Sequence, residues 1–335
     1  MRVLTITSEW PTLDHPYRAP FLVQEVDSLR RAGLEVDVFS FRGGRKPLNY
    51  LRAWSMLRKT RDLSRYDVVH AQWGQSGLIA LPTRTPLVVT FRGSDLLGIV
   101  GPTGKYIPVS LVLRRISRYV ASHAAEVIIV SRHLAQYLPF RSRVHVIPGL
   151  VDFDLFRPIP QSTARRQLGW PDRGCFVLFP ASPSNPVKRY ELAEQAVKRL
   201  QTTLEAKLIA ISGLKHEEVP IYMNACDALL LTSKHEGSPT VVREALACNL
   251  SVVSVDVGDV RQWIEGVEGC VVCSSDSAEA IARGLELVLR DRRRVRGREI
   301  IRDLDERVIT PKIIDVYRAA LRRVPGRSVV PARSI

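Results

Sequence analysis

The sequence predicts an α/β protein built from two Rossmann-like domains. The chain has 335 residues, which is enough for two α/β domains that each bury a core. Short apolar runs alternate with helix-compatible stretches along most of this length. The runs are apolar at nearly every position rather than at every second one, which is typical of parallel strands covered by helices on both faces.

The predicted strands form two groups. Six lie in the first half of the chain, at Val3–Thr7, Val36–Phe41, Val68–Ala71, Leu87–Phe91, Val127–Val130 and Val144–Ile147. Five lie in the second half, at Cys175–Phe179, Ala206–Ile211, Ala228–Leu231, Ser251–Val255 and Gly269–Val272. Because strands alternate with helical stretches in both groups, each half is predicted to form its own α/β layer, the second smaller than the first.

The boundary between the two domains is predicted within Pro148–Pro158, a segment bounded by prolines and followed by the polar stretch Ile159–Thr163. We therefore place the N-terminal domain at residues 1–155 and the C-terminal domain at residues 156–309.

The end of the chain has the signals of one more helix. Thr310 followed by Pro311 is typical of an N-cap and a first helical position, and an apolar stripe follows. An amphipathic helix is therefore expected over residues 310–324. Residues 325–335 show little periodicity and are expected to form a frayed tail.

The charge and composition limit the classes of function. The net charge is +15, and residues 1–150 hold 21 Lys+Arg against 10 Asp+Glu. A basic surface attracts nucleic acid, anionic lipid or phosphorylated ligands. The sequence contains no nucleic-acid-binding module, so nucleic acid is not expected as a partner. With no run near the roughly 20 apolar residues of a spanning helix and no signal peptide at its start, the chain is expected to be cytoplasmic.

The five cysteines are expected to be free thiols rather than disulfide partners or metal ligands. Their number is odd and they are scattered through apolar stretches. Cys270 and Cys273 have the spacing of half a zinc site, but no second pair or nearby histidine completes one. No metal is predicted.

The segment with the most functional information is Lys234–Ala247, which follows the predicted strand Ala228–Leu231. Its Gly237-Ser238-Pro239 turn predicts Ser238 as the N-cap and Pro239 as the first residue of a helix. The free amides of that first turn, up to Thr240, are expected to bind an anion at the carboxyl end of the sheet.

Two glutamates flank this turn with seven residues between them. Glu236 is expected to accept hydrogen bonds from hydroxyl groups of a sugar, and Glu244, about two helical turns later, from those of a ribose. Taken alone, each would be read first as an ordinary exposed acid, and it is the turn and the spacing that favour a site.

The stretch resembles the E-x(7)-E motif of glycosyltransferase family 4, also called group 1. The likeness continues through Ala245–Gly258, although Asn249 stands where glycine is usual. Three earlier segments, Asp67–Gly74, Phe91–Asp95 and Val146–Asp152, are similar to family stretches and occur in the same order. The resemblance thus covers most of the chain.

This resemblance implies the GT-B fold, in which two Rossmann-like domains face each other across a cleft and the last helix crosses back to the N-terminal domain. It implies that the N-terminal domain binds the acceptor and the C-terminal domain binds a nucleotide sugar. The segment Leu208–Asp227 is shorter than the family pattern, which has a further strand–helix unit there.

The resemblance also implies site residues. Lys188 matches a family lysine that holds the donor diphosphate, the arginine that normally precedes it is missing, and Arg189 is interpreted as its substitute. Glu236, Lys188 and Arg189 are therefore the catalytic candidates, and Gly237, Ser238, Pro239, Thr240 and Glu244 the donor-binding candidates. Arg92 replaces a family histidine and, with Asp95 and His70, is a candidate for acceptor or phosphate contact. The structural alternative is that the Asp95 side chain caps a helix and that the His70 ring forms a hydrogen bond with a backbone group at a strand end.

The function implied is retaining transfer of a sugar from a nucleoside-diphosphate sugar to a hydroxyl acceptor, in the biosynthesis of a glycan, polysaccharide or glycolipid. No metal or other cofactor is expected, because no Asp-x-Asp motif follows a strand. The alternative is a catalytically silent nucleotide- or sugar-binding protein on the same fold. Pro47–Arg65 and Lys105–Tyr119 mix apolar and basic residues, so they either pack on the sheet or lie on an anionic membrane beside a lipid-linked acceptor.

Overall fold

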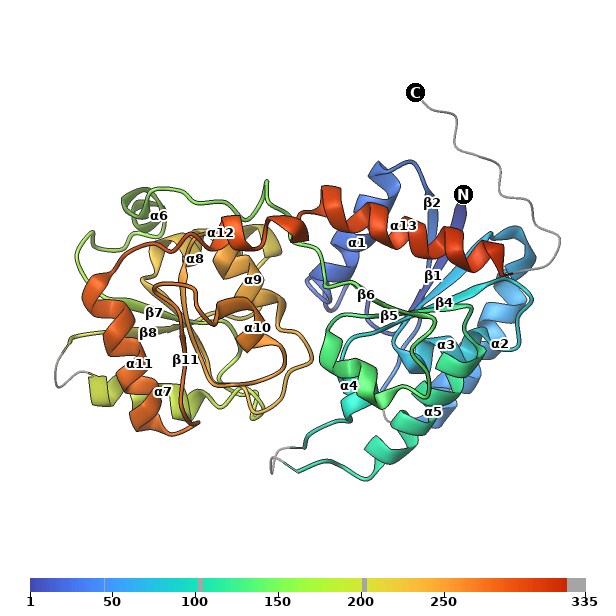
Figure 1. Ribbon diagram of the computed structural model, residues 1–335, viewed down its shortest axis with the longest axis horizontal. Coiled ribbons are helices and arrows are strands. Elements are labelled where there is room, and N and C mark those ends of the chain that lie inside the picture. The colour runs from blue at the N-terminus through green and yellow to red at the C-terminus, as the bar shows by residue number, and fades with distance from the viewer. Residues whose placement is uncertain (45, 102–104, 201–203, 324–335) are drawn as a thin grey trace. The chain divides into compact units, whose positions relative to one another are not determined.

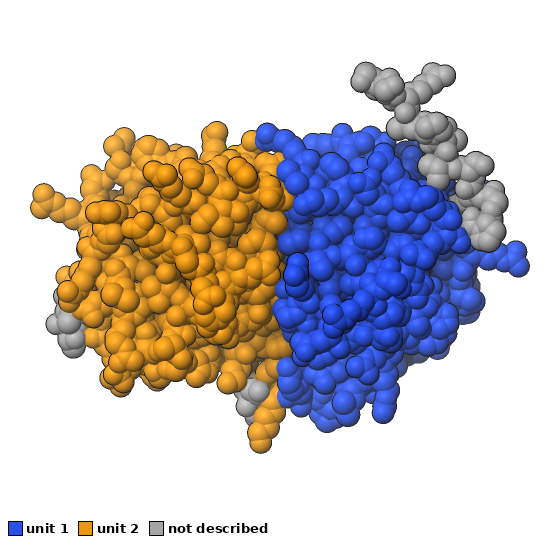
Figure 2. All heavy atoms as spheres, in the orientation of Figure 1, with its two compact units in different colours: residues 1–99, 106–150, 306–335 blue, residues 100–105, 151–305 orange. Residues whose placement is uncertain are grey.

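The computed structural model describes residues 1–335 except 45, 102–104, 201–203 and 324–335. The chain divides into two compact units (Figure 2). Unit 1 comprises Met1–Ile99, Tyr106–Leu150 and Glu306–Ile335, and unit 2 comprises Val100–Lys105 and Val151–Asp305. The divisions at residues 150 and 305 fall a few residues before the predicted boundaries. The predicted tail lies outside the described residues.

Unit 1 contains a six-stranded parallel sheet in the order β2-β1-β3-β4-β5-β6. The strands are β1 (Arg2–Thr7), β2 (Glu35–Ser40), β3 (Val68–Gln72), β4 (Leu87–Phe91), β5 (Glu126–Ile129) and β6 (Val144–Val146). β3, β4 and β5 are buried along their whole length, as expected for parallel strands covered on both faces. The six predicted strands are confirmed to within about one residue at each end.

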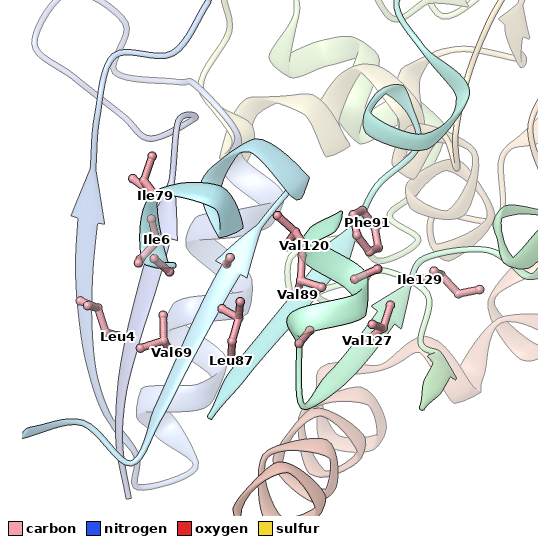
Figure 3. Close-up of a cluster of buried hydrophobic side chains, with 14 of the residues drawn as sticks. Leu4, Ile6, Val69, Ile79, Leu87, Val89, Phe91, Val120, Val127 and Ile129 are labelled. Carbon is pink, nitrogen blue, oxygen red and sulfur yellow. The ribbon is translucent and has the colours of Figure 1, made fainter. Parts of the chain in front are cut away.

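Helices cover both faces of this sheet (Figure 1). They are α1 (Pro20–Arg31), α2 (Pro47–Thr60), α3 (Gly74–Ala80), α4 (Ser94–Leu97), α5 (Val109–His123) and α13 (Glu306–Arg322), with short 3-10 turns η1 (Leu63–Arg65) and η2 (Arg132–Tyr137). In the core, Val69, Val89 and Val127 of the sheet gather with Ile79 of α3 and Val120 of α5 (Figure 3).

Glycines of α3 allow its close packing on α5. A Cβ at Gly74 would lie 2.3 Å from Ser117 Oγ, and one at Gly77 would lie 2.4 Å from a methyl carbon of Val120. Both separations are far below van der Waals contact, so these positions of α3 require glycine for the two helices to approach as they do.

The final helix begins earlier than the sequence predicts. α13 starts at Glu306, and Pro311 lies inside it rather than at its first position. Pro311 is exposed, so the helix gives up one backbone hydrogen bond on its solvent side. Thr310 is therefore inside the helix and is not its N-cap. Its buried hydroxyl donates to Ser28 Oγ of α1 at 2.9 Å. The helix packs against α1, β3, β4 and β5, which confirms the predicted return to the N-terminal domain.

Unit 2 contains a five-stranded parallel sheet in the order β11-β10-β9-β7-β8. Its strands are β7 (Phe176–Phe179), β8 (Lys207–Ala210), β9 (Ala228–Leu231), β10 (Ser251–Ser254) and β11 (Val271–Val272). Its helices are α6 (Gln161–Gln167), α7 (Tyr190–Leu200), α8 (Val219–Ala225), α9 (Thr240–Ala247), α10 (Val260–Ile264), α11 (Ala278–Asp291) and α12 (Gly297–Ile300), with η3 (His216–Glu218) and η4 (Arg302–Leu304). Both units are thus Rossmann-like, which confirms the predicted fold class.

The short connection between β8 and β9 leaves β8 at the sheet edge. Between Ala210 and Ala228, where every residue is described, the chain forms only η3 and α8. All five cysteines are free thiols. Of the helices that the structure describes, none combines the length and the apolar character required to span a bilayer.

Candidate active site

The loops that leave β7 and β9 meet at one edge of the sheet in unit 2. The two strands are parallel neighbours, so their carboxyl ends lie side by side. Backbone and side-chain bonds hold the loops together: Lys234 N donates to Val187 O at 2.8 Å, and Thr232 Oγ1 donates to Lys188 O at 2.7 Å. This edge is where ligands of open α/β sheets bind.

The two loops bring Lys188 and Glu236 into contact. Lys188 Nζ donates to Glu236 Oε1 at 2.6 Å. The side chains are 27% and 15% exposed, so both reach the surface while most of each is packed. The ion pair therefore places a cation and a carboxylate at one accessible point, from two residues separated by 48 positions in the sequence.

Arg189 follows Lys188 but points elsewhere. Its backbone is left-handed, with φ of 55°, and α7 begins at Tyr190. Its guanidinium donates to Thr232 O and to Asp276 Oδ2, both at 2.6 Å. Asp276 therefore neutralises part of the positive charge of Arg189, which the sequence analysis interpreted as a phosphate-binding charge.

The Gly237-Ser238-Pro239 turn also differs from its prediction, because the predicted cap residue has another role. α9 begins at Thr240 with Pro239 as its N-cap, so Ser238 is not the cap. Instead, Ser238 Oγ donates to Asp259 Oδ2 at 2.8 Å and accepts a hydrogen bond from Arg243 Nη1. Arg243 and Asp259 are both buried, and the hydroxyl bridges them. No side chain among the described residues caps α9, and Val242 N donates to Pro239 O at 3.2 Å, so the first-turn amides that no side chain engages are those of Thr240 and Val241.

Gly258 supports the backbone of this turn. It has φ of +61°, and a Cβ there would lie 3.1 Å from the carbonyl oxygens of both Glu236 and Gly237. A side chain would push the loop that carries Glu236 away. The turn Asp256-Val257-Gly258 after β10 therefore has a positional reason to contain glycine.

Glu244 is buried in α9 rather than exposed. Burial raises the pKa of its carboxyl to about 7, and Arg243 opposes that rise. His216 Nε2 lies 3.2 Å from Glu244 Oε1, and burial lowers the pKa of this imidazole. Phe156 packs against the ring of His216 with centroids 5.0 Å apart.

Sequence reasoning missed His216, Arg243 and Asp259. His216 lies on η3, inside the segment that is shorter than the family pattern, and no local motif marks it. Arg243 stands between the two motif positions, but its spacing gives no sign that it turns beneath the loop. The one signal in the sequence was that the segment Leu208–Asp227 is shorter than the family pattern, which indicates a local change of structure there.

The candidates of unit 1 are buried within it. His70 has no exposed surface, and its ring nitrogens lie 2.7 Å from Tyr317 Oη and 2.7 Å from Thr90 Oγ1. Burial lowers the pKa of this imidazole to about 4, so the ring is neutral at pH 7. The structure therefore places His70 in a bond between β3 and α13.

Arg92 and Asp95 also have internal partners. Arg92 Nη2 donates to Glu25 Oε2 at 2.7 Å and to Gln72 Oε1 at 2.8 Å, and its side chain is 10% exposed. Asp95 accepts from the amide of Gly93 at 3.0 Å, and burial raises its pKa to about 6. Neither residue forms a charged, open surface of the kind seen at Lys188.

Known proteins resemble both halves of the chain. The family model "Glycosyl transferase 4-like domain" matches residues 1–149, and the model "Glycosyl transferases group 1" matches residues 165–303. A D-inositol 3-phosphate glycosyltransferase from Catenulispora acidiphila is 28% identical over 67% of this chain and 63% of its own length. The aligned part therefore spans less than two thirds of that relative. One from Geodermatophilus obscurus is 27% identical over 80% of this chain and 71% of its own length.

Solved structures show the same architecture. Sucrose-phosphate synthase from Thermosynechococcus elongatus has a TM-score of 0.77 at 17% identity, over 95% of this chain and 98% of its own. The Anabaena protein HepE in complex with UDP-glucose has a TM-score of 0.70 at 18% identity, over 95% and 100%. The two family models together match both units, and the chain therefore belongs to the group 1, or family 4, glycosyltransferases, enzymes of GT-B fold that transfer glycosyl groups.

Proposed function

We propose that this enzyme transfers a sugar from a nucleoside-diphosphate sugar to a hydroxyl acceptor, with retention at the anomeric carbon and without a metal ion. The observation that carries the proposal is the Lys188–Glu236 pair beside the uncapped amino end of α9. A cation and free amides suit a diphosphate, and a carboxylate suits sugar hydroxyls. The HepE neighbour, bound to UDP-glucose, supports the donor class, and retention is proposed from the resemblance of the motif segment to the family.

The geometry suggests how the pair changes when the donor binds. Lys188 Nζ is held by Glu236 at 2.6 Å in the free protein. A donor diphosphate carries more negative charge than one carboxylate, so it would draw Lys188 away from Glu236. Glu236 is then released to accept hydrogen bonds from the sugar, and Lys188 and the amides of Gly237–Thr240 stabilise the charge that develops on the leaving diphosphate.

Glu244 is proposed to contact the ribose. It lies in α9 on the same segment as Glu236, and its partner His216 fixes the position of Oε1. Arg189 is the weaker of the catalytic candidates, because Asp276 already pairs with its guanidinium. A donor phosphate would have to compete with Asp276 for it.

The test is a set of two variants assayed for transfer and for binding. Glu236→Gln is expected to reduce transfer on the order of 100-fold, by analogy with the loss of one group that stabilises a transition state, while UDP still binds. Lys188→Ala is expected to weaken UDP more than uridine, since its partner is a phosphate. Titration calorimetry with both ligands measures this difference.

Two outcomes of that test would contradict the proposal. Unchanged turnover of Glu236→Gln at saturating substrate would remove this carboxylate from the site. Equal losses of UDP and uridine in Lys188→Ala would make Lys188 a surface residue. If the wild-type protein binds nucleotide sugars but neither transfers nor hydrolyses them, the alternative of a catalytically silent binding protein is correct.

We also propose an anionic membrane surface as a partner, with a lipid-linked acceptor. α2 buries Ala53 and Leu57 but leaves Leu48 and Leu51 52% and 61% exposed, which the alternative of a helix packed fully on the sheet does not explain. Leu48→Ser with Leu51→Ser should abolish co-sedimentation with phosphatidylglycerol vesicles at low salt. Wild-type protein that does not sediment with these vesicles would refute this partner.

A further inference from the structure

A basic cavity of about 680 Å³ lies in unit 1, and none of the residues assigned to sugar transfer lines it. Two loops form it. One connects α2 to β3 and the other connects α3 to β4. Its walls are Arg58, Lys59, Thr60, Arg61, Asp62, Leu63, Ser64, Arg65, Pro82, Thr83, Arg84 and Thr85.

The cavity is at the amino ends of the strands. β3 begins at Val68 and β4 at Leu87, directly after the two loops, and the strands are parallel neighbours. The family-like segments of unit 1 that contain Trp73 and Arg92 leave the carboxyl ends of the same two strands. The cavity therefore lies at the opposite edge of the sheet from these segments, and it includes the basic end of Pro47–Arg65.

The walls hold five cations and one carboxylate. Asp62 is already engaged: its Oδ1 accepts from Ser64 N at 3.1 Å and from Ser64 Oγ at 2.7 Å, and its other oxygen lies 3.5 Å from Arg65 Nε. Lys59 and Arg84 are exposed and form no ion pair with any residue that the structure describes. The cavity thus has an excess of positive charge that its own acid does not neutralise.

Arg58 links the two walls. Its Nη2 donates to Ala80 O at 3.1 Å and to Pro82 O at 2.8 Å, and the guanidinium lies over the ring of Trp54. Its Nη1 is buried and has no hydrogen-bond partner within the described part of the chain. Burial without a carboxylate partner lowers the pKa of this guanidinium. An unpaired, partly buried cation is costly, so an anion nearby would be favourable.

The walls are held in place before any ligand arrives. Thr85 Oγ1 donates to Leu63 O at 2.7 Å, which joins the two loops directly. Together with the bonds from Arg58, this fixes the separation of the walls. A site whose groups are already positioned loses less entropy when it binds a ligand.

We propose that this cavity binds a ligand that carries a diphosphate or several phosphate groups. Arginine forks match phosphate oxygens, and five cations around one space suit several negative charges. The volume is in the range of small-molecule sites rather than of a single ion. Because Leu63 and Pro82 are the only apolar side chains in the lining, the bound part of the ligand is polar. The phosphates belong either to a soluble metabolite or to a lipid headgroup.

The experiment compares two charge-matched variants of the full chain. The cavity variant is Lys59→Gln with Arg84→Gln, and the control is Lys312→Gln with Arg322→Gln, which removes one Lys and one Arg from exposed positions of α13. Binding is measured by titration with inorganic pyrophosphate and by sedimentation with phosphatidic acid vesicles. Because pyrophosphate is also expected at Lys188, hydrogen exchange of residues 58–65 and 82–85 reports the cavity separately.

Pyrophosphate is expected to slow exchange in both loops of the wild type and the control, with affinity in the cavity variant lower by about tenfold or more, as for lost charge-assisted bonds. Lys188→Ala should leave this protection unchanged, so the proposed donor site and the cavity fail or succeed independently. Protection by vesicles alone, lost in the cavity variant, identifies the phosphate as a lipid headgroup. No protection by either probe, or equal affinity in the two charge-matched variants, would overturn the proposal.

Discussion

The two units place polar residues at the same topological position and use them differently. In unit 2, Lys188 and Glu236 follow the carboxyl ends of β7 and β9, and their mutual ion pair remains accessible. In unit 1, Arg92 follows the carboxyl end of β4 and His70 lies within β3, and buried partners hold both. A polar residue after a parallel strand is thus a site only where no other element covers it.

The covering element in unit 1 is partly α13. Its Tyr317 reaches the ring of His70, and the helix packs on β3, β4 and β5. A buried polar group needs partners, and these residues have found them in the fold. We therefore expect substitutions in unit 1 to change mainly stability, and those around Lys188 to change mainly ligand binding.

Arg92→Ala should have the largest effect on stability. It would leave the Glu25 carboxylate buried and unpaired, which typically costs about 3–5 kcal/mol. Arg189→Ala is the matched change in unit 2. The Asp276 partner of Arg189 is 53% exposed, so solvent screens that ion pair and the expected loss is about 1 kcal/mol or less. Urea unfolding of both variants measures the difference, and equal losses would erase the distinction between the units.

Glu244 should make stability depend on pH. Its pKa rises from 4.5 to about 7 on folding, so its contribution is full below about pH 4.5 and is lost as the pH rises through about 7. At about 1.4 kcal/mol per pKa unit, the loss is up to about 3 kcal/mol. Wild type should therefore be destabilised between pH 5 and pH 8 relative to Glu244→Gln, as followed by urea unfolding.

Asp95 provides the counterpart in unit 1. Its pKa rises from 3.8 to about 6, so Asp95→Asn should alter the pH dependence at lower pH than Glu244→Gln does. If the stability of the two variants depends on pH in the same way, the two carboxyls do not differ in pKa as expected from their burial.

Tyr317→Phe should have the smallest effect. Loss of the hydroxyl leaves one ring nitrogen of His70 without its partner, which costs about 1 kcal/mol, while transfer should be unchanged. Tyr222→Phe is the control, because no hydrogen bond of the Tyr222 hydroxyl occurs within the described residues. A large loss of transfer in Tyr317→Phe would mean that His70 contributes to the reaction after all.

The sequence by itself determined the strands and the motif segment. A parallel strand covered on both faces must be apolar at almost every position, so β4 and β9 could be read directly and the other strands to within one or two residues. The spacing of Glu236 and Glu244 and the position of Lys188 after β7 likewise follow from local order along the chain. These features can be predicted without knowledge of the tertiary contacts.

The tertiary structure decided which polar groups remain available. Ser238 became a bridge because Arg243 and Asp259 are buried on either side of it, and Arg189 turned to Asp276, 87 residues away. His70 was taken by Tyr317, 247 residues away, and Glu244 met His216 because the shortened segment brings η3 to α9. The physical reason is common to all four. A hydrogen bond or ion pair depends on the distance between atoms and on their exposure, and residues far apart in a sequence acquire both only when the chain folds.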